Sequence, residues 1–199
     1  MSAMTTTTSF PNTAAAWDLP SRGKVAMAGL IVAESAIFTI FVVAYVYYIG
    51  ASKYGPTPQI LDVPWFNTVC LLSSSIAIVF AERAIERGRI RAFGAWWALT
   101  MLLGIVFLAG TAIEWKRLIY TDGLSIRTNL FGTTFYSLVG LHATHVVVGL
   151  FMLSLVMIFT LLGRVEQRHT ERIQVLSLYW HFVDAVWVVV FTVVYIVGK

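Results

Sequence analysis

Long apolar stretches separated by short polar breaks form the dominant pattern along the chain. Five such stretches cover residues 25–49, 65–81, 92–115, 130–162 and 173–198. Each is close to or longer than the roughly 20 residues that an α-helix needs to cross the hydrocarbon core of a bilayer. None alternates in the segments of about ten residues that are typical of a transmembrane β-barrel. The pattern predicts an all-α, polytopic membrane helix bundle with five transmembrane helices.

The polar breaks define the organisation of the chain. Residues 53–64 are rich in proline and glycine, residues 82–91 and 163–172 are charged turns, and residues 116–129 contain the turn signal Asp122-Gly123. Residues 1–24 are Thr-rich and polar and lack the apolar core of a signal peptide. We therefore expect a polar N-terminal tail over 1–24, lying on the membrane face, and one five-helix transmembrane domain over 25–199.

Composition narrows the class of protein. Hydrophobic residues make up 58% of the chain and charged residues 12%, about half the share of a soluble domain. The net charge of +4 is too small and too dispersed to indicate nucleic-acid binding, so no nucleic-acid partner is expected. The single cysteine, Cys70, excludes an internal disulfide and a metal site built on a cysteine pair.

Basic residues predict the orientation, because Lys and Arg are enriched in cytoplasmic loops. One side of the membrane would hold nine of the fourteen Lys and Arg residues: Arg22, Lys24, Arg83, Arg87, Arg89, Arg91, Arg164, Arg168 and Arg172. This side is predicted to be cytoplasmic, which places the N-terminus in the cytoplasm and the C-terminus outside.

Two acidic residues within the spans stand out, because a charge in hydrocarbon costs several kcal/mol. Glu34 lies near the middle of the first span with no basic residue within one helical turn. It is either a protonated structural hydrogen-bonding group or a proton-linked or lipid-linked site. Glu114 ends the third span beside Trp115, Lys116 and Arg117, which indicates an interfacial belt with a charge pair.

Two His-containing pairs have helical spacing. His142 and His145, like His181 and Asp184, are three residues apart, which places each pair on nearly one helix face. The favoured interpretation is a hydrogen-bonding seam between helices, with glycines allowing close approach. The alternative is one metal site built from all four side chains, if the two helices meet.

A redox centre within the chain is not expected. Two axial ligands of one haem approach from opposite faces, which two histidines on one helix face cannot do. The chain has only four histidines, and one of them, His169, lies in a turn. A dinuclear copper site requires two cysteines.

Several segments together resemble subunit III of the haem-copper terminal oxidases. They are residues 135–149 (FYSLVGLHATHVVVG), residues 177–187 (SLYWHFVDAVW), residues 33–38 (AESAIF) and the pair Glu114-Trp115. The resemblance covers residues 23–198. The chain resembles the short, five-helix bacterial form of this subunit. The long form has seven helices and a V-shaped cleft between its first two helices and the other five. The cleft would here be completed by another subunit or by lipid, or be absent.

The resemblance implies a non-catalytic subunit on the side of catalytic subunit I, with subunit II and a small subunit IV as further partners. Haem and copper would lie in those partner subunits, with no catalytic or metal-binding residue in this chain. Bound phospholipid, assembly and sustained proton uptake by subunit I are the implied roles. Glu34 would be the lipid-linked or proton-linked residue. The implied interhelical structural motif consists of Tyr136, His142, His145, Trp180, His181, Asp184 and Glu114.

The complex implied by the resemblance reduces oxygen to water and pumps protons across a bacterial inner membrane. Cytochrome c oxidase is the favoured class, with a quinol oxidase, or the related subunit of a nitric oxide reductase, as alternatives. Two other classes remain open: a self-contained membrane metalloenzyme, and a small transporter. Transporters have broken helices at mid-membrane, and the lack of prolines inside these spans argues against that class.

Overall fold

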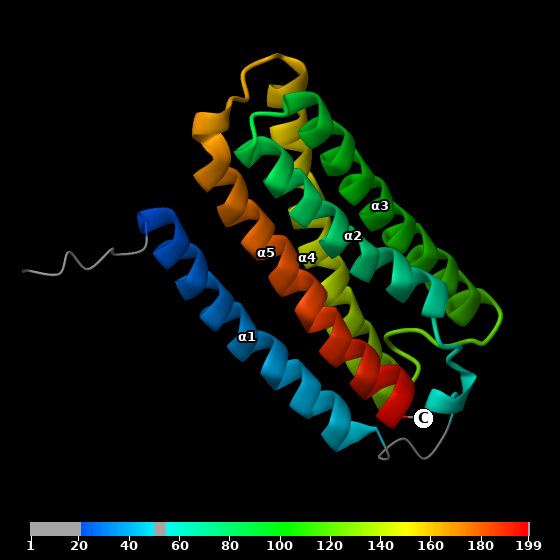
Figure 1. The fold of residues 1–199 in the computed structure, drawn as a ribbon. Helices are drawn as coiled ribbons and strands as arrows, with labels where there is room; N and C mark the ends of the chain where they lie inside the picture. Colours follow the sequence, from blue (N-terminus) through cyan, green and yellow to red (C-terminus); the bar gives the residue numbers. More distant parts are fainter. Residues whose placement is uncertain (1–20, 50–54, 199) are drawn as a thin grey trace, which may run out of the picture.

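The computed structural model describes residues 21–49 and 55–198, and its regular elements in that part of the chain are all helical. Figure 1 shows five long helices: α1 (Arg22–Tyr48), α2 (Trp65–Glu86), α3 (Ile90–Tyr120), α4 (Leu130–Leu161) and α5 (Thr170–Phe191). α5 continues into the π-helical segment η3 (Thr192–Val197), and two short 3₁₀ turns, η1 (Pro58–Ile60) and η2 (Gln167–His169), precede α2 and α5. All five helices are long and apolar enough to cross a membrane, which confirms the predicted fold class. Residues 1–20 of the predicted tail lie outside the described part.

Two helices run clearly further than their apolar stretches at the C-terminal end. α2 continues five residues beyond Ala81 to Glu86, and α3 continues past Trp115 to Tyr120. The added residues include Glu, Arg and Lys, which are good helix formers, so loss of hydrophobicity does not end a helix. The turn between α2 and α3 is therefore much shorter than the predicted charged turn over residues 82–91. It is made by Gly88, whose φ of +68° favours glycine.

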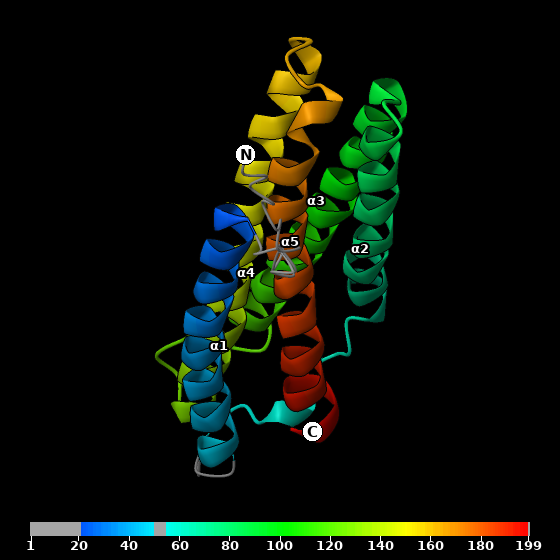
Figure 2. The same ribbon diagram turned by 60° about the vertical axis from the view of Figure 1, so that its left-hand side comes forward.

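The bundle is built around the α4–α5 pair. α1 packs against α4 and α5, while α2 and α3 form a close hairpin whose members contact α5 and α4 respectively. Figures 1 and 2 show α1 on one side of this central pair and the α2–α3 hairpin on the other.

Aromatic rings packed against small residues fill the core. Trp97, Trp180 and Trp187 are fully buried. A Cβ atom added to Gly104 or to Gly149 would lie 2.9 Å from the ring of Trp180, so these glycines make room for the indole. Small residues at helix contacts are typical of membrane proteins, because apolar burial gives little driving force in lipid.

α1 contributes least to this core. Within α1 only Phe38 and Tyr45 are buried, and most of its other apolar side chains face outward. α1 is therefore a peripheral helix, and the other helices leave most of its surface uncovered.

Candidate functional site: polar contacts between the helices

Glu34 of α1 contacts His145 of α4. Glu34 Oε2 lies 3.1 Å from His145 Nε2, and His145 Nδ1 donates a hydrogen bond to the carbonyl oxygen of Leu141 at 2.8 Å. Because Nδ1 carries a proton to make that bond, the Glu34–His145 contact contains one further proton, on either the carboxyl group or Nε2. The sequence did not predict this pair, because its members are 111 residues apart.

The Glu34–His145 pair opens into a shallow groove between α1, α4 and α5. The groove has a volume of about 290 Å³, and its lining includes Met27, Leu30, Thr144, Val148, Met152 and Tyr179. Phe38 packs against the imidazole of His145, with ring centroids 4.9 Å apart. The proton between Glu34 and His145 therefore lies at the edge of an apolar groove rather than in the closed core.

His181 and Asp184 of α5 converge on a serine of α2. Ser75 Oγ lies 3.0 Å from His181 Nδ1 and donates a short hydrogen bond to Asp184 Oδ2. Asp184 is buried, and its second oxygen, Oδ1, has no hydrogen-bond partner within the described residues. These contacts join α5 to α2.

His142 has different surroundings from His145, although the two residues share a helix. Its ring is fully buried between Phe107 and Trp187, at centroid distances of 5.7 and 4.9 Å. Neither ring nitrogen has a hydrogen-bond partner in the described part of the chain. The expectation that both histidines serve one hydrogen-bonding face is not met at His142, because its ring packs against α3 and α5 whereas His145 contacts α1.

The alternative of one four-residue metal site is also overturned by this geometry. Within residues 21–49 and 55–198, no group of three or more His, Cys, Asp or Glu side chains could hold a metal ion. His145 is directed to Glu34, the α5 pair to Ser75, and His142 to aromatic rings.

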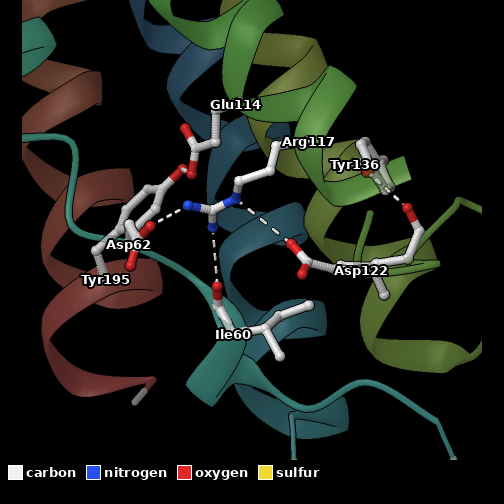
Figure 3. Close-up of polar contacts among 8 residues, drawn as sticks. Ile60, Asp62, Glu114, Arg117, Asp122, Tyr136 and Tyr195 are labelled. Atoms are coloured by element: carbon white, nitrogen blue, oxygen red, sulfur yellow. Dashed lines mark hydrogen bonds and ion pairs between the residues drawn. The ribbon is translucent and has the colours of Figure 1, made fainter. Parts of the chain in front are cut away.

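Figure 3 shows a further polar cluster, around Arg117 in the last turn of α3. The guanidinium group forms ion pairs with Asp62 and with Asp122, the latter at 3.4 Å, and donates a hydrogen bond to the carbonyl oxygen of Ile60 at 3.0 Å. Arg117 thereby joins α3 to the segment before α2 and to the α3–α4 loop.

Glu114 lies beside this cluster but has another direct partner. Its Oε1 accepts a hydrogen bond from Tyr195 Oη at 3.1 Å, whereas the ion pairs of Arg117 go to Asp62 and Asp122. Nearby, Tyr136 Oη donates to the carbonyl oxygen of Leu124 at 2.9 Å. Glu114 and Tyr136 thus connect α3 to the end of α5 and α4 to the loop before it.

Hydroxyl groups of α2 satisfy two buried indoles. Trp180 Nε1 donates to Ser74 Oγ at 2.9 Å, and Trp187 Nε1 donates to Thr68 Oγ1 at 3.2 Å. The sequence interpretation missed Thr68, Ser74 and Ser75. The run of three serines inside an apolar span was the available signal, because hydroxyls in membrane helices usually bond to a neighbour or to their own backbone.

A second groove lies along α4 and α5 at the end that carries the α4–α5 turn. Its volume is about 480 Å³. Arg164, His169 and Arg172 line it near the turn, and apolar residues line the remainder: Met152, Leu155, Val156, Phe159, Val165, Ile173 and Leu176. Neither Arg164 nor Arg172 makes an ion pair within the described residues.

The fold and these contacts define an integral membrane protein in which several intramembrane polar side chains bond across helix interfaces. The family model described as Cytochrome c oxidase subunit III matches residues 24–199. The chain therefore belongs to the cytochrome c oxidase subunit III family and is a subunit III of a haem-copper oxidase, as the resemblance implied.

Bacterial relatives agree with this assignment. The chain is 34% identical to the cytochrome c oxidase subunit 3 of Thermostichus vulcanus over 174 residues, which cover 85% of this chain and 84% of the relative. It is 33% identical to that of Alkalihalophilus pseudofirmus, with 83% and 82% covered, and 37% identical to that of Bacillus subtilis, with 72% and 70% covered.

Proposed function

We propose that this chain is a cofactor-free accessory subunit of a bacterial cytochrome c oxidase. It binds the flank of catalytic subunit I in the inner membrane, together with subunit II and a small subunit IV. The oxidase reduces oxygen to water and pumps protons, and haem and copper lie in the partner subunits. The match to subunit III over residues 24–199 carries this proposal. The polar contacts between helices support it, because His145 and His181 bond to side chains of neighbouring helices in the bundle.

Purification in mild detergent tests this proposal. We expect the tagged chain to co-purify with a large polytopic partner and with haem absorbance, and the isolated chain to contain no stoichiometric iron, copper or zinc. A stoichiometric metal in the isolated chain, or purification without a partner, would contradict the proposal. Oxygen uptake with reduced cytochrome c, compared with uptake with a quinol, distinguishes the two classes of oxidase.

The α4–α5 groove supports a lipid-binding role. Two arginines and a histidine lie at the end of the groove near the turn, and apolar side chains follow along the helices. An anionic phospholipid matches this order, because its phosphate would meet the basic residues while an acyl chain follows α4 and α5. A bound lipid there would resist rearrangement and keep the helices in place during turnover.

Lipid analysis of the purified complex tests the groove. Arg164→Gln combined with Arg172→Gln should lower the affinity for anionic phospholipid about thirtyfold, at about 1 kcal/mol for each basic residue near the headgroup. Arg168→Gln is the matched control, because Arg168 belongs to the same turn, pairs with Glu166 and does not line the groove. Equal lipid retention in the double variant and the control would reject this site.

Glu34 is proposed as a proton-linked residue of the same complex. Its contact with His145 holds one proton at the edge of a groove, so the proton could exchange during turnover. Glu34→Gln keeps the size and hydrogen-bonding capacity of the side chain but cannot release that proton. We expect the variant to lose proton uptake or turnover progressively. Unchanged turnover, pumping and lipid retention would reject the proton role.

A further inference from the structure

One side of α5 remains uncovered between α1 and α2. We call this surface the α5 strip; it consists of Leu178, His181, Ala185, Val188 and Val189 of α5 and of Thr192, the first residue of η3. These positions recur at helical spacing, and all except His181 are exposed. α1 packs on one flank of α5 and α2 on the other. The α5 strip is therefore the surface of α5 that lies between these two helices.

A groove lies between the α5 strip and α1. This groove of about 460 Å³ is lined by Ser35, Phe38, Thr39 and Val42 of α1 and by Phe182, Ala185, Val186, Val189 and Val190 of α5. Ala185 and Val189 belong to both the groove and the α5 strip. The surface is therefore a concave and largely apolar face that extends along the membrane-spanning part of α5.

A polar group interrupts this apolar face at mid-membrane. His181 is the twelfth residue of α5 and Ser75 the eleventh of α2, which places each roughly 15 Å from the start of its helix and near the centre of a hydrocarbon core about 30 Å thick. His181 is only partly buried. Its Nδ1 is bound to Ser75, whereas Nε2 makes no hydrogen bond to any described residue.

The hydrogen-bond pattern defines what Nε2 needs. A serine hydroxyl has one proton, and Ser75 donates it to Asp184 Oδ2. With Ser75 as the donor to an ionised Asp184, Ser75 Oγ accepts from His181 Nδ1, which assigns the proton of a neutral imidazole to Nδ1. Nε2 is consequently an unprotonated acceptor at the surface of the bundle, in the middle of the membrane.

We propose that the α5 strip is a docking surface for a transmembrane helix of the catalytic oxidase subunit, and that this helix donates a hydrogen bond from a hydroxyl or N–H group to His181 Nε2. This inference rests on the proposed accessory function. The concave apolar face accommodates a helix, and the single acceptor fixes its depth and rotation.

A lipid is a poorer occupant for this surface. An acyl chain has no donor for Nε2, and headgroup donors lie at the membrane surface rather than at its centre. A second copy of this chain would present the same acceptor across a two-fold axis, leaving the Nε2 atom of each copy without a donor.

Site-specific crosslinking in the intact complex tests the proposal. A photoreactive amino acid replaces Val188 of the strip or, as a matched control, Ile105 of α3; the two are β-branched, apolar and 45% and 52% exposed. We expect Val188 to yield a product with the catalytic subunit and Ile105 to yield none. Products from Ile105 alone, or products of Val188 with lipid or with a second copy, would overturn the docking surface. Co-purification of the catalytic subunit in those cases would leave the proposed function intact.

Two His181 variants test the donor. His181→Phe removes the acceptor and should lower the amount of catalytic subunit retained in detergent about fivefold, the effect of one hydrogen bond in a membrane. His181→Gln keeps an acceptor at the same reach and should restore retention. Equal retention by both variants, with thermal unfolding unchanged, would show that no donor engages His181.

Discussion

At the scale of single residues, the packing around Trp180 is so close that one added carbon atom would disturb it. Its ring faces Gly104 and Gly149 from two sides, and its Nε1 is fixed by Ser74. Gly149→Ala would place a methyl group 2.9 Å from a buried ring that has no room to move. We expect this variant to lower the free energy of unfolding by about 1–3 kcal/mol, as is usual for overpacking. Thermal or detergent unfolding of the purified protein measures the change.

Gly29 supplies the control for this substitution. It is also a helical glycine, but a Cβ atom added there meets nothing within 4 Å. Gly29→Ala should be neutral or stabilise α1 by up to about 1 kcal/mol, because alanine favours the helix. Equal destabilisation by both variants would mean that the Trp180 contact does not determine the effect of Gly149→Ala.

The Glu34–His145 pair can be measured by a double-mutant cycle. Replacing either residue by Leu removes the contact, and we expect a coupling free energy of about 1 kcal/mol, within the range of polar pairs in membranes. The comparison cycle combines Glu34→Leu with Tyr195→Phe, because Tyr195 bonds to Glu114 at the other end of the bundle. That cycle should be additive. A coupling no larger than in the comparison would show that the 3.1 Å contact contributes nothing to stability.

Contacts such as this one mark the limit of what the sequence could predict. Glu34 stood out because a carboxyl group in an apolar span needs a partner, and the partner had to lie on another helix. Its identity depends on the rotation of α1 against α4, which hydrophobicity along the chain does not encode. His142 illustrates the same limit, because its spacing to His145 indicated one shared face, while packing turned it toward Phe107 and Trp187.

At the scale of helices and loops, polar side chains stabilise the connections between the helices. Arg117 near the end of α3 binds Asp62, Asp122 and the carbonyl oxygen of Ile60, so it ties η1 and the α3–α4 loop to the bundle. Arg117→Ala should release η1. Hydrogen exchange would then speed up at the amide of Leu61, which donates to the carbonyl oxygen of Pro58 at 3.1 Å.

Lys116 provides the control for this element. It is adjacent to Arg117 and equally basic, but it makes no ion pair within the described residues. Lys116→Ala should leave exchange at Leu61 unchanged. Arg117→Lys should protect only in part, because an ammonium group cannot bind two carboxylates and a carbonyl oxygen in one plane. Unaltered exchange in Arg117→Ala would show that the turn holds without this residue.

The elements themselves were more predictable than their ends. An apolar length close to or above the span of a bilayer core forces a helix, because no other open structure satisfies its backbone there. Helix ends follow other rules: α2 ends at the left-handed Gly88, and the loop after α3 turns at the left-handed Gly123. The charged residues before these glycines continue the helix, which explains why the predicted turns over residues 82–91 and 116–129 were too long.

The whole molecule is unevenly packed. α4 and α5 are covered on two sides, whereas α1 buries only Phe38 and Tyr45 and lies at the edge. A helix with so little internal contact depends on its surroundings for a fixed position. The proposed docking surface lies beside it and would place a partner helix against both α1 and α2.

The ends of the bundle differ in charge, which leads to a prediction for the whole molecule. The end with the α2–α3 and α4–α5 turns carries Arg87, Arg89, Arg164 and Arg168, and the start of α1 adds Arg22 and Lys24. The positive-inside rule predicts that this end faces the cytoplasm. Single cysteines test it after Cys70, the sole cysteine, is replaced by Ser. Thr121→Cys, in the α3–α4 loop, should react with an impermeant maleimide in intact spheroplasts.

Glu171→Cys, at the start of α5, should react only after the membrane is opened. Both positions are exposed, and neither substitution changes the number of Lys and Arg residues, so the orientation signal itself is preserved. Labelling of Glu171→Cys in intact spheroplasts, with Thr121→Cys protected, would reverse the orientation. It would also place the basic end of the α4–α5 groove on the outside, where a lipid role would depend on the anionic lipids of the other leaflet.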